Sequence, residues 1–139
     1  MGILNLTPDS FSDGGKYNKK KLGYKRVLNL IKLGSDIVDI GGESTRPGSN
    51  TISINKEWSR IEPTLKKLKK KIPISLDTRK AQIMKKGINL GVKLINDVSG
   101  LKFDKLTVKI LKKYKTPFVI NHIQGDPLTM QKKPKYKNV

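Results

Sequence analysis

The chain has 139 residues, no Cys and a net charge of +19 at pH 7, with 30 Lys and Arg against 11 Asp and Glu. This length suits a single domain, and the lack of Cys excludes disulfides and thiolate metal sites. No apolar run approaches the roughly 20 residues that span a bilayer, and no signal segment is recognisable. We therefore expect a cytoplasmic protein without a membrane partner.

The positive charge is carried mostly by lysine. Only Arg26, Arg46, Arg60 and Arg79 are arginines, whereas nucleic-acid interfaces usually add Arg forks and stacking aromatic rings. The lysines of the segment 63–71 fall outside an apolar helical stripe, which predicts a solvated face. We expect no nucleic-acid partner. The alternative is a non-enzymatic basic remnant that binds polyanions loosely, and such binding would collapse with added salt.

Short β-branched runs alternate with longer amphipathic segments along the chain. The expected elements, in chain order, are a strand at 3–6, a helix at 20–33, a strand at 36–40, a helix at 56–71, a strand at 72–76, a helix at 79–90, a strand at 92–96, a helix at 106–114 and a strand at 117–121. Gly34 and Gly91 follow two of these helices, where a left-handed cap would end them. The alternation predicts β-α-β units and a parallel sheet.

Polar residues gather at the carboxyl end of each expected strand. They are Asn5, Asp39 with the segment 41–46, Asp77 with Thr78, Asn96 with Asp97, and Asn121 with His122. Strands of parallel sheets are buried on both faces, so polar residues at one end of successive strands point to a common site. Each pair alone would also serve as a helix N-cap. For five strands together we favour the shared site.

Two loops carry unusual chemistry. The first, Thr7–Gly15 in sequence, holds two carboxylates, three hydroxyls and two glycines, and is longer than most α/β connections. The second, Gly-Gly-Glu-Ser-Thr-Arg-Pro-Gly at 41–48, offers hydroxyls, freed backbone N–H groups and one guanidinium, which suit an anion. Its spacing matches neither a Walker loop nor a dinucleotide fingerprint.

Two strand-end residues have the chemistry to bind a heterocycle. Asp77 can accept hydrogen bonds from amino and ring N–H groups, and Asn96 can both donate and accept. His122, the only histidine, is as readily a packed residue as a catalyst. No group of His, Asp and Glu residues has the spacing typical of a zinc site. A Mg²⁺ ion bound by one protein oxygen together with substrate phosphates remains an alternative.

Five segments together resemble dihydropteroate synthase, in that family's order and approximate spacing. They are MGILNLTPDSFSDGG, DIVDIGGESTRPGS, ISLDTRKAQIMKKG, INDVSGL and NHIQGDPLTMQ. The resemblance covers essentially all 139 residues as one pterin-binding domain and implies a partial (β/α)₈ TIM barrel of about five strands and four helices. It implies condensation of 6-hydroxymethyl-7,8-dihydropterin diphosphate with p-aminobenzoate, a Mg²⁺ cofactor and a homodimer of the complete protein.

The resemblance also implies roles for individual residues. Asn5 resembles the residue that contacts Mg²⁺ and the diphosphate, and Asp77 and Asn96 resemble the pair that binds the pterin edge. The remaining carried-over residues are Thr45 and Arg46 near the diphosphate, Phe11 and Pro47 around the aminobenzoate ring, and Asp13, an acid of the first loop. Asp13 and Arg46 are the expected catalytic residues.

The chain carries no counterpart of the family's strands six to eight, which bring an Asp, a Lys, an Arg and a His to the site. We therefore expect no measurable dihydropteroate synthesis from this chain alone. A related barrel of the methyltetrahydrofolate-methyltransferase kind is the rival enzyme class, and the two loops described above argue against it.

Overall fold

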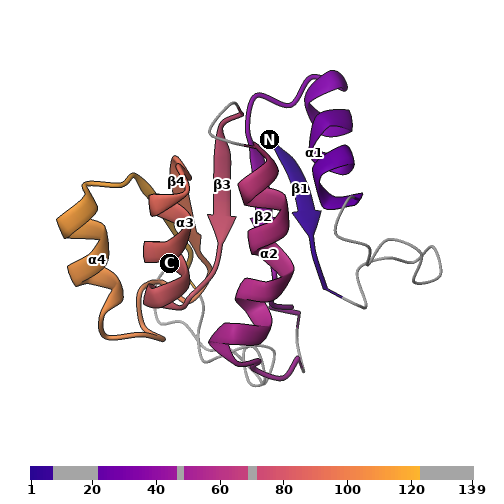
Figure 1. Ribbon diagram of the computed structural model, residues 1–139. Coiled ribbons are helices and arrows are strands. Elements are labelled where there is room, and N and C mark those ends of the chain that lie inside the picture. Colours follow the sequence, from indigo (N-terminus) through magenta and orange to yellow (C-terminus); the bar gives the residue numbers. More distant parts are fainter. Residues whose placement is uncertain (8–21, 47–48, 69–71, 123–139) are drawn as a thin grey trace.

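Five short parallel strands alternate with four helices in the computed structural model, which describes residues 1–7, 22–46, 49–68 and 72–122 (Figure 1). The elements are β1 (Gly2–Asn5), α1 (Leu22–Lys32), β2 (Val38–Gly41), α2 (Ile54–Leu68), β3 (Ile74–Asp77), α3 (Ala81–Asn89), β4 (Leu94–Asp97), α4 (Thr107–Tyr114) and β5 (Phe118–Ile120). The order and type of all nine elements are as predicted.

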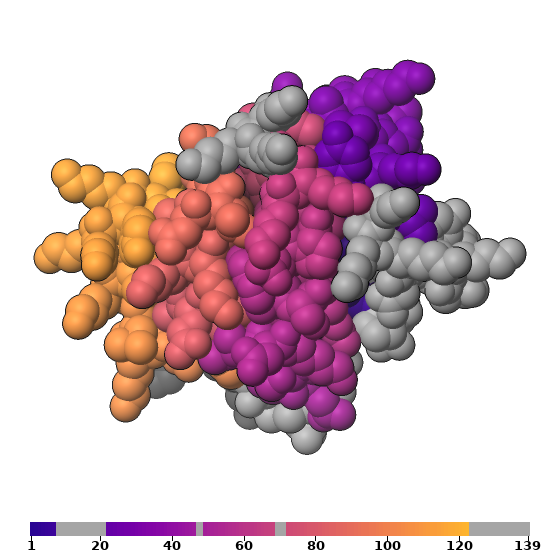
Figure 2. Space-filling view, in the orientation of Figure 1, coloured from indigo at the N-terminus to yellow at the C-terminus, as the bar shows by residue number. Residues whose placement is uncertain are grey.

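The sheet has the strand order β1-β2-β3-β4-β5, and every neighbouring pair is parallel. Each helix therefore carries the chain to the adjacent strand, and uniform crossovers place the helices on one face. α2 and α3 lie in front of the sheet in Figure 1 and form a continuous surface over its middle in Figure 2. A sheet wound in one direction is the arrangement of a barrel, not of a doubly wound sheet.

The core lies between the sheet and this helical layer. Strand residues such as Leu4, Ile40 and Leu76 are buried against apolar residues of the helices, including Ile61 and Ile83. Alternate strand residues face the other side, where Ile3 remains 63% exposed. The fold thus separates an apolar, helix-covered face from the face on which Asn5, Asp77 and Asn96 lie.

Several predicted boundaries are wrong by one or two residues. The strand expected at 92–96 begins at Leu94, because the Val92 N–H donates to the Gly87 carbonyl, 3.1 Å away, in the turn that ends α3. Conversely, Gly41, Asp77 and Asp97 belong to the strands, since their backbones continue the ladder. The helix expected at 56–71 begins at Ile54, and residues 69–71 lie outside the described part.

Both glycines expected to end helices adopt the left-handed conformation. Gly34 and Gly91 each have a φ of 96°, which L side chains rarely adopt. The prediction of two glycine caps is therefore confirmed. In the described part of the chain, no helix combines the length and apolar character needed to cross a membrane.

Candidate functional site

The strand register brings four strand ends into one row. Asn5 of β1 pairs with Gly41 of β2, Gly41 with Asp77 of β3, and Asp77 with Asn96 of β4. Three polar side chains from sequence-distant motifs are therefore neighbours at the carboxyl edge of the sheet, as the sequence pattern predicted for their position. Ligands of parallel α/β folds bind at this edge.

Side chains alternate along each strand, so the two members of each strand-end pair point to opposite faces of the sheet. Asp77 and Asn96 lie on the face away from the helices, whereas Thr78 and Asp97 turn toward the helical side and are buried. Asp97 is fully buried and accepts hydrogen bonds from the N–H groups of Ser99 (2.8 Å) and Leu101 (3.2 Å). Asp97 therefore holds the β4–α4 loop, and the site has one residue, not two, from this strand end.

A polar contact crosses the sheet beneath the row. Asn96 Nδ2 donates to Asp39 Oδ2 at 3.0 Å, although the two residues are 57 positions apart in sequence. Asp39 is only 6% exposed, and its register partner Ser75 is fully buried. Asp39 Oδ1 and Ser75 Oγ find no hydrogen-bond partner among the described residues. Such buried orphan atoms are uncommon and call for an explanation.

Gly41 leaves room at the centre of the row. A Cβ at this position would lie 3.2 Å from Asp77 Oδ2 and 3.3 Å from Asn5 Oδ1, closer than ordinary contact. The missing side chain thus lets two oxygen atoms approach the same point from both sides. Glycine is needed here for close approach, not for its backbone freedom.

The charge at this edge is unbalanced. Burial, together with the smaller effects of the nearby carboxylates of Asp39, Glu57, Asp97 and Glu43 in that order, raises the pKa of Asp77 to about 7. A carboxyl group of this kind holds a proton near neutral pH and can donate as well as accept. Because burial and the neighbouring carboxylates disfavour the ionised form of Asp77, a ligand that donates N–H groups to it would stabilise that form.

The second loop is held by one buried carboxylate. Glu43 Oε1 accepts from the Ile52 N–H at 2.8 Å, and Glu43 Oε2 accepts from Arg79 Nε at 2.8 Å. Burial raises the pKa of Glu43, but hydrogen bonds from Arg79 and Lys80 outweigh it, so the net pKa lies below 4.5. Glu43 thereby joins the two ends of the loop that carries Thr45 and Arg46 to each other and to Arg79, two residues before α3.

Lys80 links this loop to α2 in a buried ion network. Its Nζ donates to Glu43 Oε1 at 2.7 Å and to Glu57 Oε2 at 2.6 Å, and Thr78 Oγ1 donates to Glu57 Oε1 at 2.6 Å. Glu57 is fully buried. Sequence reasoning missed this network, although Glu57 stands four residues before Ile61 in the apolar stripe of α2, and a carboxylate there needs a buried partner.

The other predicted site residues are placed as follows. Thr45 is half-buried and Arg46 is exposed, both in the loop after β2, and His122 is exposed two residues after β5. Phe11, Asp13 and Pro47 lie outside the described residues. The catalytic and binding roles of all these residues stay predictions.

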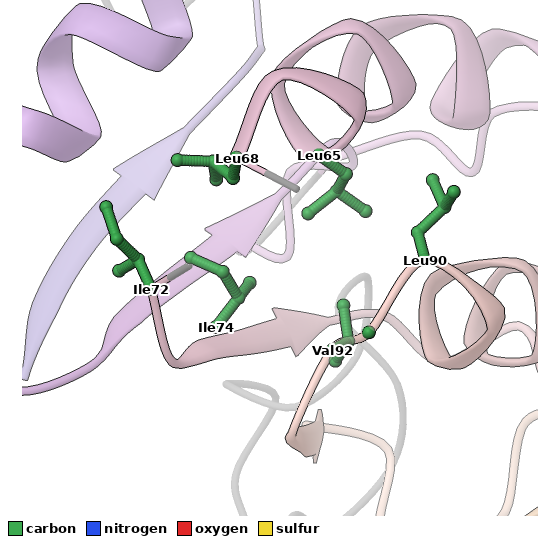
Figure 3. Close-up of a pocket in the computed structure, with 7 residues that line it drawn as sticks. Leu65, Leu68, Ile72, Ile74, Leu90 and Val92 are labelled. Carbon is green, nitrogen blue, oxygen red and sulfur yellow. The ribbon is translucent and has the colours of Figure 1, made fainter. Parts of the chain in front are cut away.

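A pocket elsewhere in the molecule has the wrong chemistry for such a site. Leu65 and Leu68 at the end of α2, Ile72 and Ile74 at the start of β3, and Leu90 and Val92 after α3 line it (Figure 3). It lies at the amino ends of the strands, opposite the polar row, and the described residues that line it carry no polar side chain. We interpret it as imperfect packing, because a ligand site needs polar groups to orient its occupant.

A singly wound parallel sheet with polar side chains in a row at its carboxyl edge is typical of a β/α barrel, in which ligands bind at that edge. The family comparison agrees with this class. The model of the pterin binding enzyme family matches residues 1–139, and the chain belongs to that family.

Several named relatives are dihydropteroate synthases. The protein of Neisseria meningitidis serogroup B is 46% identical over 142 residues, covering 100% of this chain and 50% of that protein. The protein of Synechocystis is 41% identical over 133 residues, covering 94% of this chain and 46% of that protein. The chain thus spans about half the length of these relatives.

Solved structures give the same result. The dihydropteroate synthase of Clostridium difficile, determined in the presence of pteroic acid, matches with a TM-score of 0.86 and 41% identity over 100% of this chain and 51% of that one. The Yersinia pestis synthase, in a sulfonamide drug complex, matches with a TM-score of 0.88 and 37% identity over 99% and 50%. The five strands and four helices match half of the barrel of these enzymes.

Proposed function

We propose that the described strand ends form part of a dihydropteroate synthase site, which joins a pterin diphosphate to p-aminobenzoate and releases diphosphate. The observation that carries the proposal is the register pairing of Asp77 with Asn96 beside Asn5. The similarity to dihydropteroate synthases over the whole chain supports it. The named relatives favour this reaction over a methyltransferase.

Asp77 and Asn96 have the chemistry that a pterin edge requires. A pterin presents amino and ring N–H donors beside ring nitrogen acceptors, and the pair offers a carboxyl group and an amide in adjacent register positions. Both residues are half-buried, so their hydrogen bonds to a ligand would be formed away from bulk water. The pterin ring would therefore lie across the ends of β3 and β4.

Arg46, Thr45 and Asn5 are the candidate contacts of the diphosphate. Arg46 is exposed and forms no ion pair with the described residues, while its backbone carbonyl accepts from the Ser49 N–H at 3.0 Å in a turn. A guanidinium and a hydroxyl suit phosphate oxygens. Loss of diphosphate leaves positive charge on the pterin methylene, so the carboxyl-rich floor and the cationic rim would each stabilise the charge that develops beside it.

The residues present fit a magnesium ion held jointly with the substrate. Asn5 Oδ1 is a hard oxygen donor next to the open space at Gly41. In the ranges that the structure describes, no three His, Cys, Asp or Glu side chains cluster as a metal site. Mg²⁺ is commonly bound through one or two protein oxygens plus substrate phosphates, and it neutralises charge on the leaving diphosphate. A cytoplasmic location and a homodimer of the complete protein stay predictions.

A chimera tests the proposal directly. Residues 1–139 would replace the matching half of the Neisseria meningitidis synthase, and the purified chimera would be assayed with pterin diphosphate, p-aminobenzoate and Mg²⁺. We expect dihydropteroate formation that Asp77→Ala lowers by at least tenfold. Lys105→Ala, which changes an exposed lysine near the start of α4, is the control and should leave the rate unchanged. A folded chimera without turnover, or equal rates for the two variants, would refute the proposal.

A further inference from the structure

Asp39 is a buried carboxylate that none of the expected site roles uses. It lies two residues before Gly41 on β2, so it occupies the layer of side chains directly beneath the row of Asn5, Asp77 and Asn96. Among the described residues, its side chain accepts one hydrogen bond, from Asn96 Nδ2. We propose that Asp39 is a positioning residue that fixes the orientation of the Asn96 amide and thereby determines which ligand edge the site accepts. The inference rests on the proposed function for the identity of the ligand.

The orientation follows from the chemistry of the two groups. An ionised carboxylate has only acceptors, so it can pair with the Nδ2 end of an amide and repels the Oδ1 end. With Nδ2 directed at Asp39 in the layer below, Asn96 Oδ1 lies on the opposite side of the amide, toward the strand ends. Asn96 therefore presents an acceptor to a ligand, and the site favours an edge that carries a donor opposite it.

The cost of burying Asp39 argues against a purely structural role. Glu43 and Glu57 are also buried, but cations and hydroxyls satisfy their oxygens. Within the described part of the chain, Asp39 has one hydrogen bond and an orphan Oδ1, and no salt bridge joins it to a cation. A buried charge that is poorly compensated is destabilising. A neutral acceptor would be enough to satisfy the Asn96 amide. The negative charge of Asp39 therefore serves to exclude the flipped orientation, in which Asn96 Oδ1 would point at Asp39.

Two variants distinguish the effect of the hydrogen-bond acceptor at position 39 from the effects of charge and side-chain size. Asp39→Asn keeps an amide oxygen that can accept from Asn96, whereas Asp39→Leu has similar bulk and no acceptor. The control is Asp36→Leu, at an exposed position three residues earlier. Urea unfolding of each variant establishes that it is folded before binding is measured.

The first readout is the Asn96 side-chain amide in the proton–nitrogen NMR spectrum of the chain without ligand. We expect slow hydrogen exchange of one Asn96 Hδ2 relative to the exposed Asn55 and Asn89 in the wild type, in Asp39→Asn and in Asp36→Leu. Asp39→Leu should lose this protection. Wild-type Asn96 protons that exchange as fast as those of Asn55 would overturn the proposal, even if Asp39→Leu does not fold.

The second readout is ligand selectivity in the chimera described above. Pterin carries an amino group at the position where lumazine carries an oxo group, so the two probes differ in donor and acceptor at one edge. We expect both Asp39→Leu and Asp39→Asn to lower the preference for pterin by about tenfold or more, because neither side chain carries the charge that excludes the flipped Asn96 amide. An unchanged preference in Asp39→Leu would overturn the proposal. If the chimera binds neither probe, the proposed function fails, and the NMR result still decides the role of Asp39.

Discussion

Removal of Lys80 should destabilise the protein far more than removal of a surface lysine. Lys80 Nζ lies 2.7 Å from Glu43 Oε1 and 2.6 Å from Glu57 Oε2, and the three side chains are 6%, 4% and 0% exposed. Lys80→Met leaves both carboxylates buried without their shared cation. Breaking a buried pair in this way typically costs about 3–5 kcal/mol. Glu43 keeps Arg79, so most of the cost falls on Glu57, which keeps only the Thr78 hydroxyl.

Urea unfolding at pH 7 measures this effect. A loss of about 4 kcal/mol is a large part of the roughly 5–15 kcal/mol that stabilises a typical domain, and it would lower the midpoint by about 2 M for an m-value near 2 kcal/mol/M. The matched control is Lys66→Met, which breaks a 2.8 Å pair with Glu62 whose side chains are 62% and 33% exposed. An exposed pair of this kind contributes less than about 1 kcal/mol.

The double variant Lys80→Met with Glu57→Gln should recover part of the loss, because it removes the uncompensated charge. The reasoning is refuted if Lys80→Met and Lys66→Met unfold within about 1 kcal/mol of each other, since the two pairs differ mainly in burial.

Three further predictions follow from the site. Asp77→Asn should stabilise the protein at pH 8 by up to about 4 kcal/mol, because the pKa of Asp77 is about 7 in the folded state and 3.8 in the unfolded state. Between pH 3.8 and 7 the folded state binds one more proton than the unfolded state, so the stability of the wild type falls as pH rises. Urea midpoints measured from pH 4 to 8 should show this decline in the wild type and not in the variant. Gly41→Ala should weaken pterin diphosphate binding in the chimera, measured by calorimetry, with little loss of stability, because its Cβ displaces the Asn5 and Asp77 side chains. Gly34→Ala, at a φ of 96° and with open space around it, should instead cost about 1 kcal/mol of stability, measured by urea unfolding, and leave binding unchanged. Asp97→Ala should destabilise by about 1–3 kcal/mol, since it leaves the Ser99 and Leu101 N–H groups without their acceptor, and faster hydrogen exchange at those two amides would confirm the cause.

The sequence predicted the order of elements and the location of the polar strand ends, because both depend on local periodicity. It did not predict how each polar pair divides between the two faces. Asn96 and Asp97 are adjacent in sequence but have separate roles in space, since adjacent strand residues point in opposite directions.

Long-range polar contacts also escaped sequence reasoning. Lys80 meets Glu43 and Glu57 across separations of 37 and 23 residues, and Asn96 meets Asp39 across 57. No local pattern encodes such pairs. The burial of a Glu within the apolar stripe of α2 is the one sequence signal that a cation must lie opposite it.

The central claim is that the carboxyl ends of β3 and β4 bind a pterin. A crystal structure of the chimera with bound pterin tests it most directly. The account predicts that the ring lies within hydrogen-bond distance of both Asp77 and Asn96, with Asp39 behind the Asn96 amide. A pterin bound away from both residues, for example in the apolar pocket between α2 and the end of α3, would contradict it.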